Sequence, residues 1–126
     1  MKYIITESQF NLLTENKKMV LFQDLINQTL NHIIEGCDKS YDEFPDDISF
    51  DACDNAELVN EIKLLSFEFK NNIFILNVNI VFTSIKSYLD FLNLLYNIGD
   101  IIYKKFQVKV ILKEINQTNT KTDFNS

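Results

Sequence analysis

Residues 65–82 read LSFEFKNNIFILNVNIVF, and this stretch decides the fold. Large apolar residues recur at every second position on both sides of Asn71–Asn72, which is the pattern of paired β-strands. Asparagine tolerates the left-handed backbone that a type I′ turn requires, so the stretch predicts a hairpin with a two-residue turn. The expected facing pairs, all on one face of the sheet, are Phe69 with Phe74, Phe67 with Leu76, and Leu65 with Val78.

Amphipathic helices are predicted on both sides of this hairpin. A capping-box pattern at Thr6–Gln9 predicts a helix start, and apolar residues recur at helical spacing from Phe22 to Ile34, with Gly36 expected to end that helix. A second helical stripe is capped by Ser84 and runs from Ile85 to Tyr103. It contains Gly99, which costs a helix roughly 1 kcal/mol relative to alanine, so we expect the helix backbone to approach the sheet closely there.

Three further features complete the predicted order of elements. Lys2–Ile5 is expected to form a short first strand, residues 106–112 alternate as a last strand, and the adjacent leucines at 64 and 65 predict a bulge or phase slip. The order predicts an α+β domain of the βαββαβ ferredoxin-like kind, or a truncated variant if the first strand does not pair. Its sheet would be antiparallel with helices on one face. One domain is expected over 1–115, with a polar tail at 116–126.

The negative charge of the chain is concentrated between the first helix and the hairpin. Residues 35–61 hold ten of the eighteen carboxylates and one lysine, a formal charge of −9 within a chain of −6. Aromatic residues lie among the acids, although a purely solvated linker has little reason to contain them. We expect a mostly irregular excursion pinned to the domain by Phe44 and Phe50, with a helical turn within 52–60.

This acidic excursion is predicted to bind a basic protein partner. Concentrated negative charge attracts lysine-rich or arginine-rich surfaces, and an aromatic side chain can anchor such a contact. The simpler interpretation is a loop whose charges are only solvated. The candidate partner-binding residues are Tyr41, Asp42, Glu43, Phe44, Asp46, Asp47, Asp51 and Asp54.

The residue pattern argues against an enzyme. His32 is the single histidine and flanks an apolar helical stripe without a nucleophile at helical spacing, so we expect a boundary residue. Cys37 has no neighbouring base and lies among acids, which disfavours a reactive thiolate. An EF-hand starting at Asp46 fails at its third, fifth and sixth positions. We therefore expect no catalytic residue, no metal and no cofactor.

Composition also limits the partners and the compartment. The chain has no arginine, the residue that reads bases and phosphates bidentately, and its net charge of −6 repels phosphate, so no nucleic-acid partner is expected. The sequence shows neither a signal peptide nor an apolar run that approaches a membrane span. We therefore expect a cytoplasmic protein without membrane contact, whose core contains no disulfide and whose Cys37 and Cys53 are reduced.

A second candidate surface is the sheet face opposite the helices. Ile73, Ile75 and Ile111 would be exposed there among polar residues. Such a face exposes enough apolar surface to support a homodimer. Self-association of a virion structural or assembly protein through this face is therefore the alternative function.

The first ten residues, MKYIITESQF, suggest an origin. They resemble the start of small uncharacterised proteins of tailed phages and A/T-rich bacteria, which open with a K-x-I-I-T-E-S-Q type segment. The resemblance is confined to this segment and transfers no site residue to the remaining chain. It implies a phage-encoded accessory or virion-associated protein, located in the host cytoplasm or in the virion.

Overall fold

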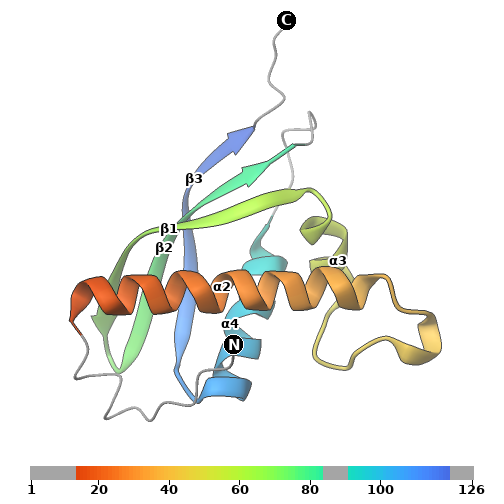
Figure 1. Cartoon of the computed structure of the whole chain (residues 1–126), viewed down its shortest axis with the longest axis horizontal. Helices are drawn as coiled ribbons and strands as arrows, with labels where there is room; N and C mark the ends of the chain where they lie inside the picture. Colours follow the sequence, from red (N-terminus) through yellow and green to blue (C-terminus); the bar gives the residue numbers. More distant parts are fainter. Residues whose placement is uncertain (1–13, 84–90, 120–126) are drawn as a thin grey trace, which may run out of the picture.

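The computed structural model describes residues 14–83 and 91–119, which form an α+β fold of three α-helices and a three-stranded mixed sheet (Figure 1). The predicted strand at Lys2–Ile5, the helix start at Thr6 and the cap at Ser84 lie outside the described residues. In chain order the elements are α2 (Glu15–Cys37), the 3-10 turn η1 (Tyr41–Glu43), α3 (Phe50–Ala56), β1 (Val59–Lys70), β2 (Ile73–Phe82), α4 (Leu92–Phe106) and β3 (Val110–Asn119).

The hairpin of β1 and β2 confirms the predicted turn. Asn71 and Asn72 have φ angles of 55° and 64°, the left-handed conformation that asparagine tolerates. Phe69 pairs with Phe74, and Phe67 pairs with Leu76 as expected. The predicted bulge lies between Leu64 and Ser66, so Leu64 takes the place opposite Val78 that was expected for Leu65. Leu65 is the extra residue, and its side chain is exposed.

The third strand corrects the predicted topology. β3 pairs with β2 in parallel, from Phe74–Val110 to Phe82–Asn119, so the expectation of an all-antiparallel sheet was wrong. The sheet order is β1-β2-β3. In a ferredoxin-like sheet the first strand lies between the two strands that correspond to β2 and β3. Here β2 and β3 pair directly, with no strand between them. The described residues therefore do not show the βαββαβ arrangement.

Helices α2 and α4 cover one face of the sheet. α2 contacts β1, α4 contacts β3, and the two helices also contact each other, as their crossing in Figure 1 illustrates. The β2 side chains that face the helices are buried, while most of those on the opposite face are half-buried. Phe22 of α2 is fully buried and packs its ring 5.1 Å from that of Phe74. This layer between helices and sheet is the core.

Two helical glycines allow close contacts, Gly36 with the segment that contains Pro45 and Ile48 and Gly99 with β3. α2 continues one residue beyond Gly36, which therefore does not end the helix as predicted. A Cβ atom at Gly36 would collide with the Ile48 side chain and lie 3.1 Å from Pro45 Cγ. A Cβ atom at Gly99 of α4 would lie 3.0 Å from the Val110 carbonyl oxygen, which confirms the predicted close approach to the sheet.

The last strand begins and ends later than the alternation of the sequence suggested. α4 continues to Phe106, and Gln107 caps it in the left-handed conformation with a φ angle of 59°. β3 then starts at Val110 and extends to Asn119, where it pairs with the end of β2. Residues 116–119, assigned above to the polar tail, therefore belong to the sheet.

Candidate functional site

A disulfide closes the acidic excursion at its base. Cys37, the last residue of α2, is bonded to Cys53 of α3 with Cα atoms 5.6 Å apart. The prediction of reduced thiols and of a core without a disulfide was therefore wrong. The reason lies in tertiary structure, because packing of α3 beside the end of α2 brings together cysteines that are 16 positions apart. We refer to the enclosed residues 38–52 as the acidic loop.

The acidic loop is held against the domain by one buried apolar side chain and one buried amide. Ile48 is 4% exposed and lies against Gly36. The Asn97 side chain, 7% exposed in the middle of α4, accepts a hydrogen bond from the Ser49 backbone N–H (3.0 Å). Its amide group donates to the Asp47 backbone carbonyl (2.8 Å). Sequence reasoning missed Asn97, whose only signal was a polar residue within an apolar helical stripe.

Of the two phenylalanines that were predicted to pin the loop to the domain, Phe44 packs against the core as expected and Phe50 does not. Phe44 is half-buried against the core, whereas Phe50 is 61% exposed and stacks on Phe44 with ring centroids 4.6 Å apart. Phe50 therefore does not pin the loop to the domain, because α3 begins at this residue and turns Ala52 and Cys53 inward instead. What Phe50 offers is an exposed ring on a fixed support.

His32 pairs with a carboxylate that helical spacing could not reveal. Its Nε2 atom lies 3.0 Å from Oδ2 of Asp47, and both side chains are about one-third exposed. The contact ties the loop to the flank of α2, which agrees with a boundary role for the histidine. Within residues 14–83 and 91–119, no group of three or more histidine, cysteine or acidic side chains is arranged to hold a metal ion.

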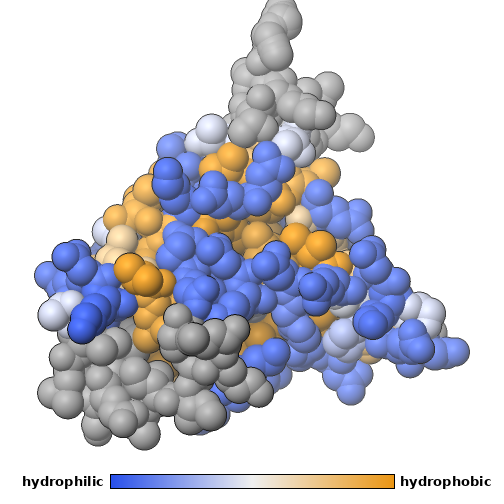
Figure 2. All heavy atoms as spheres, in the orientation of Figure 1, coloured by the Kyte–Doolittle hydropathy of each residue, from blue (hydrophilic) through white to orange (hydrophobic). Residues whose placement is uncertain are grey.

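The structure brings most of the predicted binding residues to the solvent-facing side of this closed loop. Asp47 is half-buried in its pair with His32, and Asp51 accepts a hydrogen bond from the Asn93 side chain of α4 (3.4 Å). Tyr41 begins η1, and its side chain is not described. Hydrophilic residues gather over the loop on the right of Figure 2. Among the predicted binding residues, the exposed carboxylates are those of Asp42, Glu43, Asp46, Asp51 and Asp54.

Lys104 of α4 is influenced by charges at this end of the domain. Its ammonium group lies 3.0 Å from the Asp100 carboxylate, and this hydrogen bond and charge raise the pKa of Lys104 above its ordinary value. Asp47 of the acidic loop contributes to the rise more weakly. The main cause of the raised pKa of Lys104 is thus Asp100, one turn away on the same helix.

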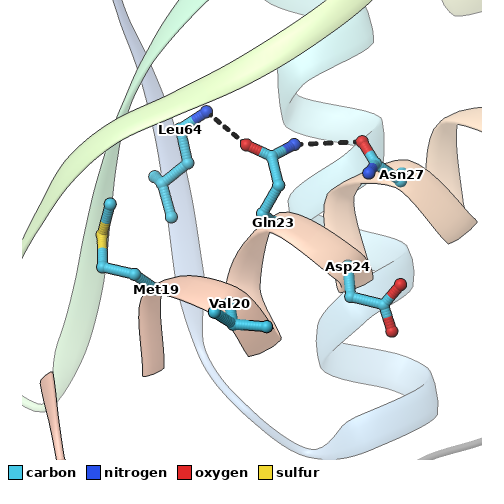
Figure 3. Close-up of a pocket in the computed structure, with 6 residues that line it drawn as sticks. All are labelled: Met19, Val20, Gln23, Asp24, Asn27 and Leu64. Atoms are coloured by element: carbon cyan, nitrogen blue, oxygen red, sulfur yellow. Dashed lines mark hydrogen bonds between the residues drawn. The ribbon is translucent and has the colours of Figure 1, made fainter. Parts of the chain in front are cut away.

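A separate groove lies between α2 and β1 and was not foreseen from the sequence (Figure 3). It has a volume of about 520 Å³. Gln23 lies in it and bonds to the backbone of β1, with its Oε1 atom accepting from the Leu64 N–H at 2.7 Å. The lining residues are Met19, Val20, Gln23, Asp24, Asn27 and Leu64.

Comparison of the chain with protein-family models, with curated proteins and with solved structures finds no match. In the described part of the chain, no helix combines the length and the apolar character needed to cross a membrane.

Proposed function

We propose that this protein is a non-enzymatic interaction module that binds a basic protein partner through the acidic loop. The observation that carries the proposal is the construction of the loop. A disulfide, a buried amide and a buried isoleucine fix its backbone, while five of the predicted binding carboxylates and the Phe50 ring face solvent on or beside it. A loop that is fixed in this way loses little conformational freedom when it binds.

The chemistry of the loop fits a lysine-rich or arginine-rich surface. Clustered carboxylates accelerate encounter with a cationic partner and favour it over an acidic one. Exposed aromatic rings are common anchors of protein interfaces, and a ring face also attracts a cation. Phe50 and the neighbouring carboxylates thus combine an apolar contact with an electrostatic one.

Binding of a labelled peptide of alternating lysine and leucine, followed by fluorescence anisotropy, tests this function. Changing Asp42, Asp46 and Asp51 together to Asn should weaken binding at least tenfold at low salt, and raising the salt should weaken wild-type binding. The matched control changes Glu15, Glu68 and Glu114 to Gln, which removes the same charge away from the loop. An equal loss of affinity in both variants, or a wild-type affinity that does not change with salt concentration, would contradict the proposal.

A second candidate function is self-association through the open sheet face, as in a virion structural or assembly protein. The observation that favours it is exposed apolar surface on this side, where Ile111 and Ile115 are 52% and 51% exposed and Ile73 and Ile75 are half-buried. Sedimentation at increasing concentration would show a dimer that Ile75→Lys disrupts. A wild-type monomer at high concentration would eliminate this candidate.

The proposal includes a phage origin, for which the support is the resemblance of residues 1–10. The predicted locations were the host cytoplasm and the virion. Disulfides are rare in reducing cytosol and persist outside it. The bond between Cys37 and Cys53 therefore supports the virion over the cytoplasm.

A further inference from the structure

Strand β1 forms an edge of the sheet. The order β1-β2-β3 leaves it with β2 as its single strand neighbour among the described residues, and its 12 residues make it the longest strand. Such an edge presents backbone N–H and C=O groups that can template pairing with another strand. What occupies those groups therefore shows whether the edge is open or closed.

The side chain of Gln23 is hydrogen-bonded to two of these backbone groups of β1. Its Oε1 atom accepts a hydrogen bond from the Leu64 N–H (2.7 Å), and its Nε2 atom donates to the Ile62 carbonyl (2.9 Å). The Asn27 side chain accepts from the same nitrogen at 3.0 Å and so fixes the orientation of the amide (Figure 3). A carboxamide carries the same donor and acceptor as a peptide group. Gln23 thus takes the place of a neighbouring strand.

The charges along β1 are complementary to a second copy of the same strand. Four charged residues of β1 lie on the face of the sheet away from the helices. Their partners on β2 show this, because the pairs are Glu61 with Val81, Lys63 with Asn79, Glu68 with Ile75, and Lys70 with Ile73. In an antiparallel pair with Glu61 opposite Lys70 of the second copy, Lys63 lies opposite Glu68. The two-fold axis repeats both pairs. Four opposite-charge contacts result, each of the kind that stabilises cross-strand pairs.

The backbone of β1 has the matching register. Hydrogen-bonded and non-hydrogen-bonded pairs alternate along an antiparallel ladder, and a two-residue turn is closed by a hydrogen-bonded pair, here Lys70 with Ile73. Phe67 and Phe69 therefore direct their peptide groups away from β2. The bonds of Gln23 show that Ile62 and Leu64 do the same on the other side of the Leu65 bulge.

In the charge-matched register these outward groups meet. Ile62 lies opposite Phe69 of the second copy, and Leu64 lies opposite Phe67 of the second copy. The Leu64 N–H would then donate to the Phe67 carbonyl, and the Ile62 carbonyl would accept from the Phe69 N–H. Oε1 and Nε2 of Gln23 hold these two places in the isolated chain. Without the bulge, charges and hydrogen bonds would not fit in one register.

The groove beside β1 has room for the arriving side chains. It is about 520 Å³ in volume and is bordered by apolar Met19, Val20 and Leu64. Val20 is 69% exposed in the isolated chain, and Phe69 is 51% exposed. Pairing of two β1 edges would remove part of this apolar surface from water, which favours association.

We propose that β1 is a self-recognition strand kept closed by Gln23. Two copies of the chain pair antiparallel through residues 61–70 when the Gln23 side chain releases Ile62 and Leu64. The inference does not depend on the acidic loop or on its partner, and it uses the edge of the sheet rather than the open face.

Analytical ultracentrifugation of the full chain tests the role of Gln23. The variant Gln23→Met keeps the size of the side chain and removes its polar atoms, so it should dimerise at least tenfold more tightly than the wild type. The control Gln28→Met lies on the same helix but removes a hydrogen bond to Asp24 only. It should match the wild type. A Gln23→Met variant that associates no more tightly than the wild type overturns the proposal.

Charge variants in the Gln23→Met background test the register. Glu61→Lys with Glu68→Lys places like charges opposite each other, as does Lys63→Glu with Lys70→Glu, so each pair of changes should weaken dimerisation. Mixing the two variants should give a heterodimer. Variants that dimerise as tightly as their parent, or that fail to form the heterodimer, contradict the register.

Hydrogen exchange at the Leu64 amide distinguishes the edge from the open sheet face. This amide should exchange slowly in the wild type and quickly in dilute Gln23→Met, and it should become protected again in the dimer. A Gln23→Met dimer in which Leu64 exchanges quickly would place the interface elsewhere and overturn the proposal.

Discussion

Asn97 shows how a single buried side chain can decide where a loop lies. Its carboxamide meets one N–H and one C=O group of the acidic loop, so neither group is left unpaired beside the buried face of α4. Gln23 does the same for β1. Gly36 acts by the opposite means, because the lack of a side chain admits Ile48. All three residues thus make possible contacts between elements that regular secondary structure does not supply.

Replacing Asn97 by Leu should therefore loosen the loop. The change leaves the Ser49 N–H and the Asp47 carbonyl without their partner, at a cost of about 1–3 kcal/mol for each buried group that stays unpaired. Urea unfolding should show the lower stability, and the Ser49 amide should exchange faster with solvent. The control Asn93→Ala removes an exposed amide of the same helix and should change stability by less than about 0.5 kcal/mol.

At the level of elements, the sequence predicted correctly those features of helices and strands that local interactions determine. The turn at Asn71–Asn72 and the apolar stripe of α2 each depend on residues close in the chain or on the period of one element. The approach at Gly99 is a contact between α4 and β3, and its signal in the sequence was a glycine within a helical stripe. The acidic loop did not follow from the sequence in this way. Its exposed carboxylates were predicted, but its closure by Cys37 and Cys53 and its pairing with His32 depend on contacts between elements.

Removal of the disulfide should destabilise the protein and free the acidic loop. A cross-link that closes a loop of about 15 residues contributes roughly 3 kcal/mol by restricting the unfolded chain. Urea unfolding of the wild type with and without reductant measures this effect. Reductant should leave a variant with both Cys37→Ser and Cys53→Ser unchanged. An equal response of that variant to reductant would show that the disulfide is not the cause.

At the scale of the whole molecule, the position of β3 organises the domain. Its parallel pairing with β2 requires a connection that crosses from one end of the sheet to the other, and α4 lies within that connection. The same crossover places α4 beside α3, where Asn97 reaches the acidic loop. Fold and candidate site are thus linked through α4.

The length of β3 gives a test at this scale. A chain that ends at Ile115 loses the pairs from Asn79–Asn116 to Phe82–Asn119, whereas a chain that ends at Asn119 keeps every described pair. The shorter chain should be less stable by about 1–3 kcal/mol, since each lost backbone hydrogen bond contributes about 1 kcal/mol net. Thermal or urea unfolding of the two chains measures the difference. Equal stability would show that residues 116–119 contribute nothing to the sheet.

The sequence by itself determined the α+β class, the hairpin with its bulge, the amphipathic helices and the concentration of charge, because each depends on residue type and spacing within one segment. Only the tertiary structure decided that β3 lies parallel to β2, that Cys37 meets Cys53, that Asp47 meets His32 and that Gln23 covers the edge of β1. These contacts join residues from separate elements. Their geometry is set by how the helices pack on the sheet, and no local pattern in the sequence predicts it.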